Sequence, residues 1–430
     1  MNLILAVPVL ITTLLLLYRA VTFRTFDFFI WLLLLPFFSI PYFFDCLLLS
    51  DTIGDQALFY AGSCALLFNL CFYFTIRIIV KRKITIVVLS DASSSMKYFL
   101  LALLTVSVLF LLRHLYEVFG VSVTSLGTVF LMGFREVGLD DSTVYRDIYH
   151  RLASIGAVAL AVLVAGRDRF WSVIAFMLIF LGILLEGTRW LLIPAIGPII
   201  YSYALSRTVS FMALFKLGCI GLVALFLVFH VQTLRYSGDR SATNAIDVDL
   251  ISQTAERITD FGDTKETAAG EFRLRHFYYY LTENMSAKHE YGYGVTYLRM
   301  ALVGVPTERS HGLKPRDLTK DIADWIYPHR AGFGGTVHPL LYGDSYANFG
   351  VLGGFLGIFW AVMIGLLSRL TAGQINNIQI LCLPLMATFC LFLARGAVYS
   401  SFFFLVSGAI VILILVFIRK LFLVNISVVR

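Results

Sequence analysis

The stretch LLYGDSYANFGVLGGFLGIFWAVMIGLLS, residues 340–368, carries one charged side chain, that of Asp344. A helix that crosses a bilayer needs ~20 mostly apolar residues, and this run is longer than that. Its apolar residues do not alternate with polar ones, as they would in a strand of a membrane β-barrel. The run therefore predicts a membrane-spanning helix, and similar runs recur along the whole chain.

Together these runs predict an all-α polytopic membrane protein of about eleven transmembrane helices. The composition agrees, because 59% of the 430 residues are hydrophobic and only 14% are charged. Soluble domains average roughly 45–50% apolar and 25% charged residues, so an ordinary soluble enzyme is excluded. The formal charge of +7 is not gathered on one face, which excludes a nucleic-acid-binding protein. The predicted spans are 2–18, 28–49, 57–79, 98–118, 152–166, 170–186, 189–206, 210–233, 340–368, 378–394 and 398–418.

The charges in the short connections predict the orientation, because cytoplasmic loops carry an excess of Lys and Arg. Lys81, Arg82 and Lys83 follow the third span, whereas the connection 50–56 holds two acids and no base. The N-terminus is therefore predicted outside and the C-terminus inside. An additional span at 121–134 would change the first half of this topology. The first run lacks a basic n-region and is predicted to be a retained helix.

This orientation divides the chain into spans one to eight (1–233), a large external loop (234–339) and spans nine to eleven (340–430). The loop is nearly neutral and rich in aromatic residues, which predicts order from Gly270 onward. Segment 271–285 is predicted to be a helix near the membrane surface. The tyrosines of the external loop either stack on sugar rings or form an interfacial aromatic belt, and the sequence leaves both open.

Two arginines lie near the predicted outer boundary of the membrane. Arg189 follows Glu186 where one span ends and the next begins, and Arg395 lies in the tight turn between the last two spans. A buried cation costs ~2.5–3.5 kcal/mol at mid-membrane, so such residues usually face a cavity or a partner. Because guanidinium groups bind phosphate well, both residues predict a site for a lipid-linked phosphate or pyrophosphate. Snorkelling, or pairing of Arg189 with Glu186, is the alternative.

The residues that open the ninth span combine a base candidate, a carboxylate and an amide. Pro339 can begin a helix, so Asp344 and Asn348 become i,i+4 neighbours on one face, with His338 just before it. The alternative is a capped, hydrated helix end. Two pairs of glycines, 350/354 and 353/357, predict close helix packing.

A third cluster lies in the external loop, where Gly292-Tyr293-Gly294 precedes Thr296-Tyr297-Leu298-Arg299. The glycines do not follow a strand, so a dinucleotide site is a poor interpretation. The segment predicts a loop against the membrane, with Arg299 and Lys314 turned towards anionic groups. Asp140 and Asp141 lack a third metal ligand, and a solvated loop is favoured there.

These motifs together resemble the Wzy-type O-antigen polymerases, also called oligosaccharide repeat unit polymerases. The resemblance covers about residues 186–360 and rests on the Gly-Thr-Arg of 187–189, the Gly-x-Thr-Tyr-Leu-Arg of 294–299 and the His-Pro-Leu-Leu-Tyr-Gly-Asp-Ser-Tyr segment that begins at 338. That family shares a GT-C-like architecture with O-antigen ligases. The chain departs from it at Asp344, where many relatives have Glu, and at Thr307-Glu308-Arg309, where an aromatic and basic stretch is more usual.

The resemblance implies a glycosyltransferase that joins undecaprenyl-pyrophosphate-linked repeat units into O-antigen or a similar surface polysaccharide, at the outer face of the bacterial inner membrane. It implies no cofactor and no metal. Arg189, with Arg395 or Arg299, would stabilise the leaving pyrophosphate. His338 or Asp344 would activate the acceptor hydroxyl, and Lys314, Tyr346 and Asn348 would contact substrate. The implied partners are the lipid-linked oligosaccharide, membrane lipids, and a chain-length regulator and flippase of the same pathway, with no nucleic acid.

Three other functions stay open. An O-antigen ligase would transfer the glycan to another acceptor, and a lipid-linked oligosaccharide flippase or other transporter would move it without forming a bond. A receptor or scaffold would do neither. Transporters often show inverted repeats and broken midplane helices. No such repeat is evident, and the polar candidates gather at the outer face, which favours the enzyme.

Overall fold

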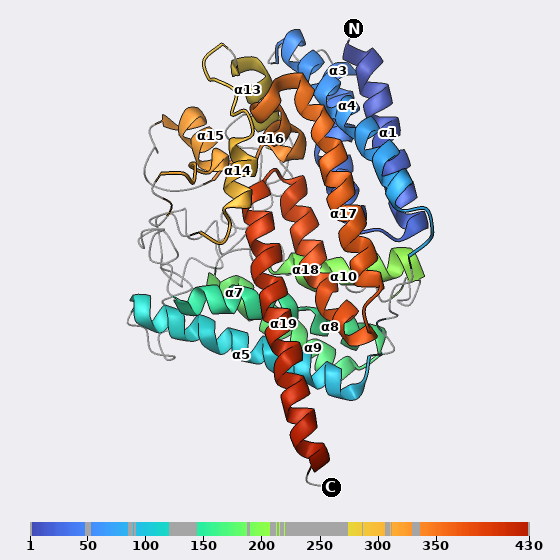
Figure 1. Ribbon diagram of the computed structural model, residues 1–430, viewed down its shortest axis with the longest axis vertical. Helices are drawn as coiled ribbons and strands as arrows, with labels where there is room; N and C mark the ends of the chain where they lie inside the picture. Colours follow the sequence, from blue (N-terminus) through green and yellow to red (C-terminus); the bar gives the residue numbers. More distant parts are fainter. Residues whose placement is uncertain are drawn as a thin grey trace, which may run out of the picture. The chain divides into compact units, whose positions relative to one another are not determined.

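The described residues of the computed structural model form helices and no β-strand, so the all-α prediction is confirmed (Figure 1). They are residues 2–47, 53–84, 89, 92–119, 144–186, 190–206, 212, 215, 219, 274–285, 287–305, 310, 312–328 and 336–428.

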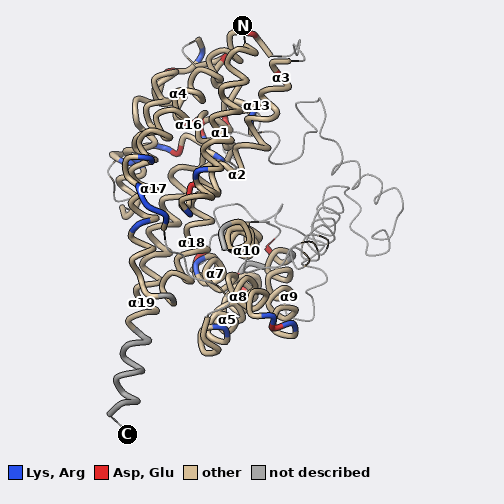
Figure 2. Tube along the Cα trace, turned by 90° about the vertical axis from the view of Figure 1, so that its right-hand side faces the viewer, with Lys and Arg blue, Asp and Glu red and all other residues tan. Residues whose placement is uncertain are grey.

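Within these residues, eight helical segments are long and apolar enough to cross a membrane. This supports the prediction of a multi-pass membrane protein, and the traces of α1, α4 and α17 are uncharged over most of their length in Figure 2. The segments are α1 (Asn2–Phe23), α2–η1–α3 (Phe28–Leu34, Leu35–Ser39, Ile40–Leu47), α4 (Asp55–Ile79), α5 (Ser94–Phe119), α7–α8 (Val144–Gly156, Val158–Ala165), α16–η8–α17 (Leu340–Phe349, Gly350–Phe355, Leu356–Ala372), α18 (Asn376–Ala394) and α19 (Val398–Val428).

Two further apolar helices are shorter, α9 (Arg169–Glu186) and α10 (Leu192–Ser206). Helix α10 matches the short seventh span and continues through Pro198 without a break. The eighth predicted span, 210–233, lies almost wholly outside the described residues, as does the additional span considered at 121–134. Ten of the eleven predicted positions therefore coincide with a described helix.

The chain divides into two compact units. Unit 1 comprises Met1–Ile86, Gly270–Gln374 and Thr388–Val406, and unit 2 comprises Val87–Ala269, Ile375–Ala387 and Ser407–Arg430. In unit 2, α5 packs against α7 and α9, and α8 packs against α9 and α10.

The fifth span starts earlier than the predicted 152–166, because α7 begins at Val144. Arg146, Asp147 and His150 lower the average hydropathy of this part. One face of α7 is nevertheless buried, and Tyr149 is 0% exposed. Residues 120–143 lie outside the described residues.

Helix α4 is central to unit 1 and packs against α1, α13 (Leu274–Asn284) and α17. A buried polar network ties α16 to this core: the Tyr342 hydroxyl donates to Asn69 Oδ1 at 2.7 Å, and Asn69 Nδ2 donates to the Thr12 and Thr13 hydroxyls at 3.1 Å. Because its buried polar groups find partners, the hydrogen bonds of the network offset the cost of taking these groups out of water. The helix predicted at 271–285 is confirmed as α13.

The predicted span 340–368 is confirmed within the apolar segment Leu340–Ala372, but it is not one continuous α-helix, because the short 3₁₀ segment η8 follows α16. Gly350 has a φ of +61°, a conformation that a glycine adopts without strain. A Cβ on Gly353 would lie 2.0 Å from the Ser345 carbonyl oxygen, so this 3₁₀ turn, η8, requires glycine there too. The close packing predicted from the other two glycines is confirmed, since Cβ atoms at 354 and 357 would meet α4.

Candidate functional site

Helix α16 of unit 1, labelled in Figure 1, carries different side chains on two of its faces. Asp344 and Asn348 lie one turn apart on one face, as predicted, and Asn348 Nδ2 donates to the Asp344 carbonyl oxygen at 2.8 Å and to Oδ1 at 3.4 Å. Tyr342 and Tyr346 lie one turn apart on the other face, and both contact the Tyr278 ring of α13. Pro339 precedes the first helical residue, Leu340, at the N-cap position.

The Asn348 side chain fastens α16 to α14 (Val295–Ala301). Its Oδ1 accepts from the Gly294 N–H at 3.1 Å, and its Nδ2 donates to the Thr296 hydroxyl at 3.0 Å. Asn348 is 0% exposed, so the alternative of a hydrated helix end is wrong for this residue. The loop before α14 is also held by the backbone, where the Gly292 N–H donates to the Ala347 carbonyl oxygen at 2.9 Å.

Asp344 is a buried carboxylate with one oxygen unused by the described residues. The residue is 1% exposed, and the Tyr297 hydroxyl lies 3.5 Å from its Oδ1. Its Oδ2 is buried without a hydrogen-bond partner among the described residues. Nearly all buried polar atoms are hydrogen-bonded, so an unpartnered one asks for an explanation such as an absent ligand.

Arg299 and Lys314, both predicted to face anionic groups, come together on the ring of Tyr399. The Arg299 guanidinium lies 4.2 Å from the ring centroid and the Lys314 Nζ lies 5.1 Å from it. Both distances fit a cation–π contact. Lys314 is only 7% exposed and donates to the Val305 carbonyl oxygen at 2.7 Å, so it is buried in the protein.

Asp317 lies near both Arg299 and Asp344. Its Oδ2 lies 3.9 Å from Arg299 Nε, and its negative charge is close enough to Asp344 to repel that carboxylate. Asp317 also caps α15 (Leu318–Ile326) by accepting from the Thr319 N–H at 3.1 Å. The cations and the buried carboxylate therefore belong to one polar cluster of unit 1.

His338 and Arg395 form a second group, at the start of α16. The Arg395 carbonyl oxygen accepts from the Leu340 N–H at 2.9 Å. Burial, together with the Arg395 cation, lowers the pKa of His338 to about 3. The imidazole is therefore neutral at physiological pH, and its Nδ1 has no hydrogen-bond partner among the described residues.

Arg189 lies outside the described residues. Its neighbour Glu186 in unit 2 is 1% exposed and has described partners on α7 and in the turn after α9. Glu186 Oε1 contacts His150 and lies 3.7 Å from Arg146, and Oε2 accepts from Trp190 Nε1 at 2.6 Å.

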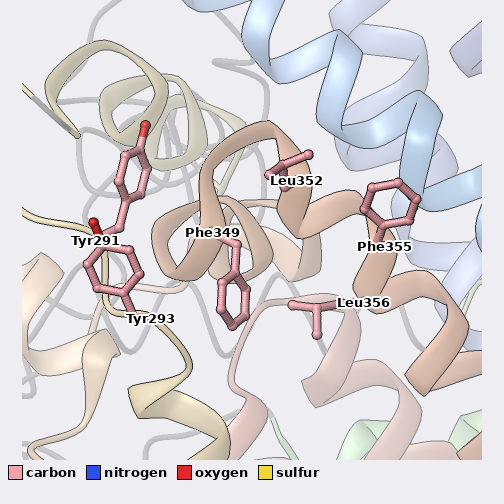
Figure 3. A pocket seen from close by; sticks show the side chains of 6 residues that line it. All are labelled: Tyr291, Tyr293, Phe349, Leu352, Phe355 and Leu356. Atoms are coloured by element: carbon pink, nitrogen blue, oxygen red, sulfur yellow. The ribbon is translucent and has the colours of Figure 1, made fainter.

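A pocket that the sequence analysis did not predict lies beside the C-terminal end of α16. It has a volume of about 400 Å³ and is lined by Tyr291, Tyr293, Phe349, Leu352, Phe355 and Leu356. Figure 3 shows the two tyrosines on one side, Phe355 and Leu356 on the other, and Phe349 between them. The sequence shows the aromatic residues Tyr291, Tyr293 and Phe349, but nothing near them indicates that the two segments meet.

Comparisons with protein-family models, curated proteins and solved structures find no match to this chain. Among the described residues, no group of three or more His, Cys, Asp or Glu side chains is placed to hold a metal ion.

Proposed function

We propose that the chain is a membrane glycosyltransferase that joins polyprenyl-pyrophosphate-linked oligosaccharide repeat units into a surface polysaccharide. The observation that carries this proposal is the convergence of Arg299 and Lys314 on Tyr399, in one polar cluster with the buried Asp344. The eight apolar segments favour a substrate that resides in the bilayer. The GT-C-like fold and the O-antigen polymerase family belong to this proposal.

In the proposed reaction, a hydroxyl of the acceptor sugar attacks the anomeric carbon of the donor glycan. A new glycosidic bond forms, and the bond between that carbon and the pyrophosphate oxygen breaks. The undecaprenyl pyrophosphate leaves with the bonding electron pair, and fixed cations stabilise the charge that develops on it. Arg299 and Lys314 supply such charge, with Arg189 and Arg395 as further candidates.

The proton of the attacking hydroxyl needs an acceptor, and Asp344 is a better candidate for it than His338. Its unpartnered Oδ2 offers a lone pair within the same cluster as the cations. His338 is neutral, but a base with a pKa of about 3 is poorly matched to proton transfer at neutral pH. The structure therefore favours Asp344 as general base, with Tyr297 and Asn348 orienting its other oxygen.

The apolar pocket beside α16 suits the hydrocarbon part of such a substrate. Its walls come from η8, the start of α17 and the end of α16, and three of its residues are well exposed: Tyr293 (77%), Leu352 (66%) and Phe355 (51%). An aromatic and aliphatic lining of this kind binds an isoprenoid chain with few polar groups to desolvate.

The test uses the full-length protein in nanodiscs with a lipid-linked repeat unit from the same source, and the products are resolved by size. We expect a ladder of multimers with the wild type and no ladder with Asp344→Asn or Arg189→Ala. Asp324→Asn serves as a matched control, because Asp324 lies on α15 and pairs with the exposed Arg316.

Two outcomes would replace the proposal by another function. A single transfer to a different acceptor, without a ladder, would indicate a ligase. Movement of the carrier across the bilayer without a new glycosidic bond would indicate a transporter. Full activity of Asp344→Asn would remove Asp344 from the mechanism.

A further inference from the structure

A second pocket of unit 1 shares Tyr291 with the apolar one but differs from it in chemistry. It has a volume of about 490 Å³, within the ~300–1,000 Å³ of typical ligand pockets. The start of α4 and the end of α13 supply most of its walls. Its lining residues are Gly54, Gln56, Ala57, Tyr60, Thr282, Glu283, Met285, Ala287, Tyr291, Tyr346 and Val351.

The polar groups of this pocket match the hydroxyls of a neutral ligand. Gln56 Nε2 donates to the Tyr60 hydroxyl oxygen at 3.0 Å, which leaves the hydroxyl hydrogen of Tyr60 available for an acceptor. Glu283 faces the pocket from α13, and its Oε1 lies 4.0 Å from the position of a Cβ on Gly54. A carboxylate, an amide and phenols together accept and donate hydrogen bonds in the way that vicinal hydroxyls require.

The charge of the lining argues against a phosphate group. The described lining residues include one carboxylate, Glu283, and neither Lys nor Arg. A pyrophosphate would be repelled by that carboxylate without a compensating cation. The rings of Tyr291 and Tyr346, 6.1 Å apart at 67°, instead offer aromatic surfaces to the apolar C–H face of a sugar ring.

The pocket lies on the opposite side of α16 from Asp344. Tyr346 follows Asp344 by two residues, which rotates its side chain by about 200° around a helix of 3.6 residues per turn. The contacts agree, because Tyr346 meets Tyr278 and Tyr291 while Asp344 meets Tyr297. A ligand in this pocket is therefore not at the proposed reacting bond.

We infer that this pocket binds a neutral sugar of the glycan at a distance from the reacting bond and so retains the chain between transfers. That the sugar belongs to a growing glycan rests on the proposed function, whereas the assignment of a saccharide-binding site does not. The Glu283 carboxylate and the Tyr60 hydroxyl hold the sugar hydroxyls, and Tyr291 and Tyr346 pack against the ring.

The test measures sugar binding directly, without catalysis. Full-length protein in nanodiscs is titrated with a panel of methyl glycosides of glucose, galactose, N-acetylglucosamine and rhamnose, and binding is followed by saturation-transfer NMR. Ala287→Trp fills the pocket from an exposed position, and Ala301→Trp places the same side chain on the exposed face of α14, outside the pocket.

We expect at least one glycoside to bind the wild type and Ala301→Trp equally, and Ala287→Trp to lose that binding. Glu283→Gln, which keeps the shape and removes the charge, should weaken it roughly tenfold, the effect of losing one charge-assisted hydrogen bond. Binding by Ala287→Trp as tight as that of the wild type would overturn the inference, as would a wild type that binds none of the panel.

Product length separates a failure of this inference from a failure of the proposed function. If both hold, Ala287→Trp still forms the first glycosidic bond but makes shorter chains than Ala301→Trp. If Ala287→Trp abolishes glycoside binding but the wild type makes no ladder, the saccharide site is supported and the polymerase function is contradicted. If Ala287→Trp makes a ladder of full length, the retention role is contradicted and the polymerase function is supported.

Discussion

The guanidinium of Arg299 lies 4.2 Å from the ring centroid of Tyr399, and this contact joins α14 to the first turn of α19. The ring also lies 5.1 Å from Lys314 Nζ. One aromatic ring thus gathers two cations that lie fifteen residues apart in the sequence, and it partly offsets the repulsion between them.

Removing this ring should separate the cations. We expect Tyr399→Leu to weaken binding of inorganic pyrophosphate by roughly five- to thirtyfold, because a partly desolvated cation–π contact contributes about 1–2 kcal/mol. Tyr399→Phe keeps the ring and should bind like the wild type. Isothermal titration of both variants in nanodiscs checks this, and equal weakening in both would mean that the hydroxyl matters and the ring does not.

The turn between α18 and α19 should tolerate no side chain at Gly396. This residue has a φ of +86°, and a Cβ would lie 2.5 Å from the Leu340 carbonyl oxygen. We expect Gly396→Ala to lower the free energy of unfolding by about 1–3 kcal/mol, the usual cost of a strained backbone site. Gly373→Ala is the control, because its new Cβ would have only ordinary contacts at 3.7 Å. Thermal unfolding of the two variants gives the comparison.

Exchanging the Asn348 amide for a carboxylate should disable the site. Asn348→Asp removes the donor to Thr296 and Asp344 and places a second buried carboxylate beside the first. Like charges at this distance destabilise each other strongly when buried. We expect at least a hundredfold loss of polymerisation, which the product ladder measures. Asn348→Asp with wild-type activity would show that the amide only closes the helix end.

The stability of unit 1 should decrease in acid because of His338. Its pKa falls from 6.5 in the unfolded chain to about 3 in the folded protein, so the unfolded state binds more protons between these values. The stabilising contribution is complete above pH 6.5 and is lost as the pH falls towards 3. His338→Gln should flatten this part of the profile of melting temperature against pH. An unchanged slope in that variant would assign the acid sensitivity to other groups.

The sequence predicted the membrane helices well, because their signal is local. The apolar run 57–79 corresponds to α4, Asp55–Ile79, and 98–118 corresponds to α5, Ser94–Phe119. Helix α13 and the Asp344–Asn348 face were also predictable, since both depend on spacing within one helix.

The parts that escaped prediction depend on contacts between distant segments. Nothing in the sequence near Arg299 indicates that its partner is Tyr399, and nothing near Tyr342 indicates Asn69. The break after Phe349 was missed for the same reason, because it follows from the approach of Gly353 to the Ser345 carbonyl oxygen. The two pockets likewise form only when Tyr291, from the segment between α13 and α14, meets residues of α16 and η8.

Because two faces of α16 carry different groups, the number of residues between Tyr342 and Asn348 matters as much as their identity. Inserting or deleting a single residue between Tyr342 and Asn348 would turn everything beyond it by about 100°. Asp344 could then no longer face Tyr297 of α14 while Tyr342 and Tyr346 both face Tyr278 of α13. Chains that share this arrangement are therefore expected to keep the spacing Tyr-x-Asp-x-Tyr-x-Asn of residues 342–348. That spacing, together with a downstream Tyr to gather the cations, is a pattern by which such chains can be sought.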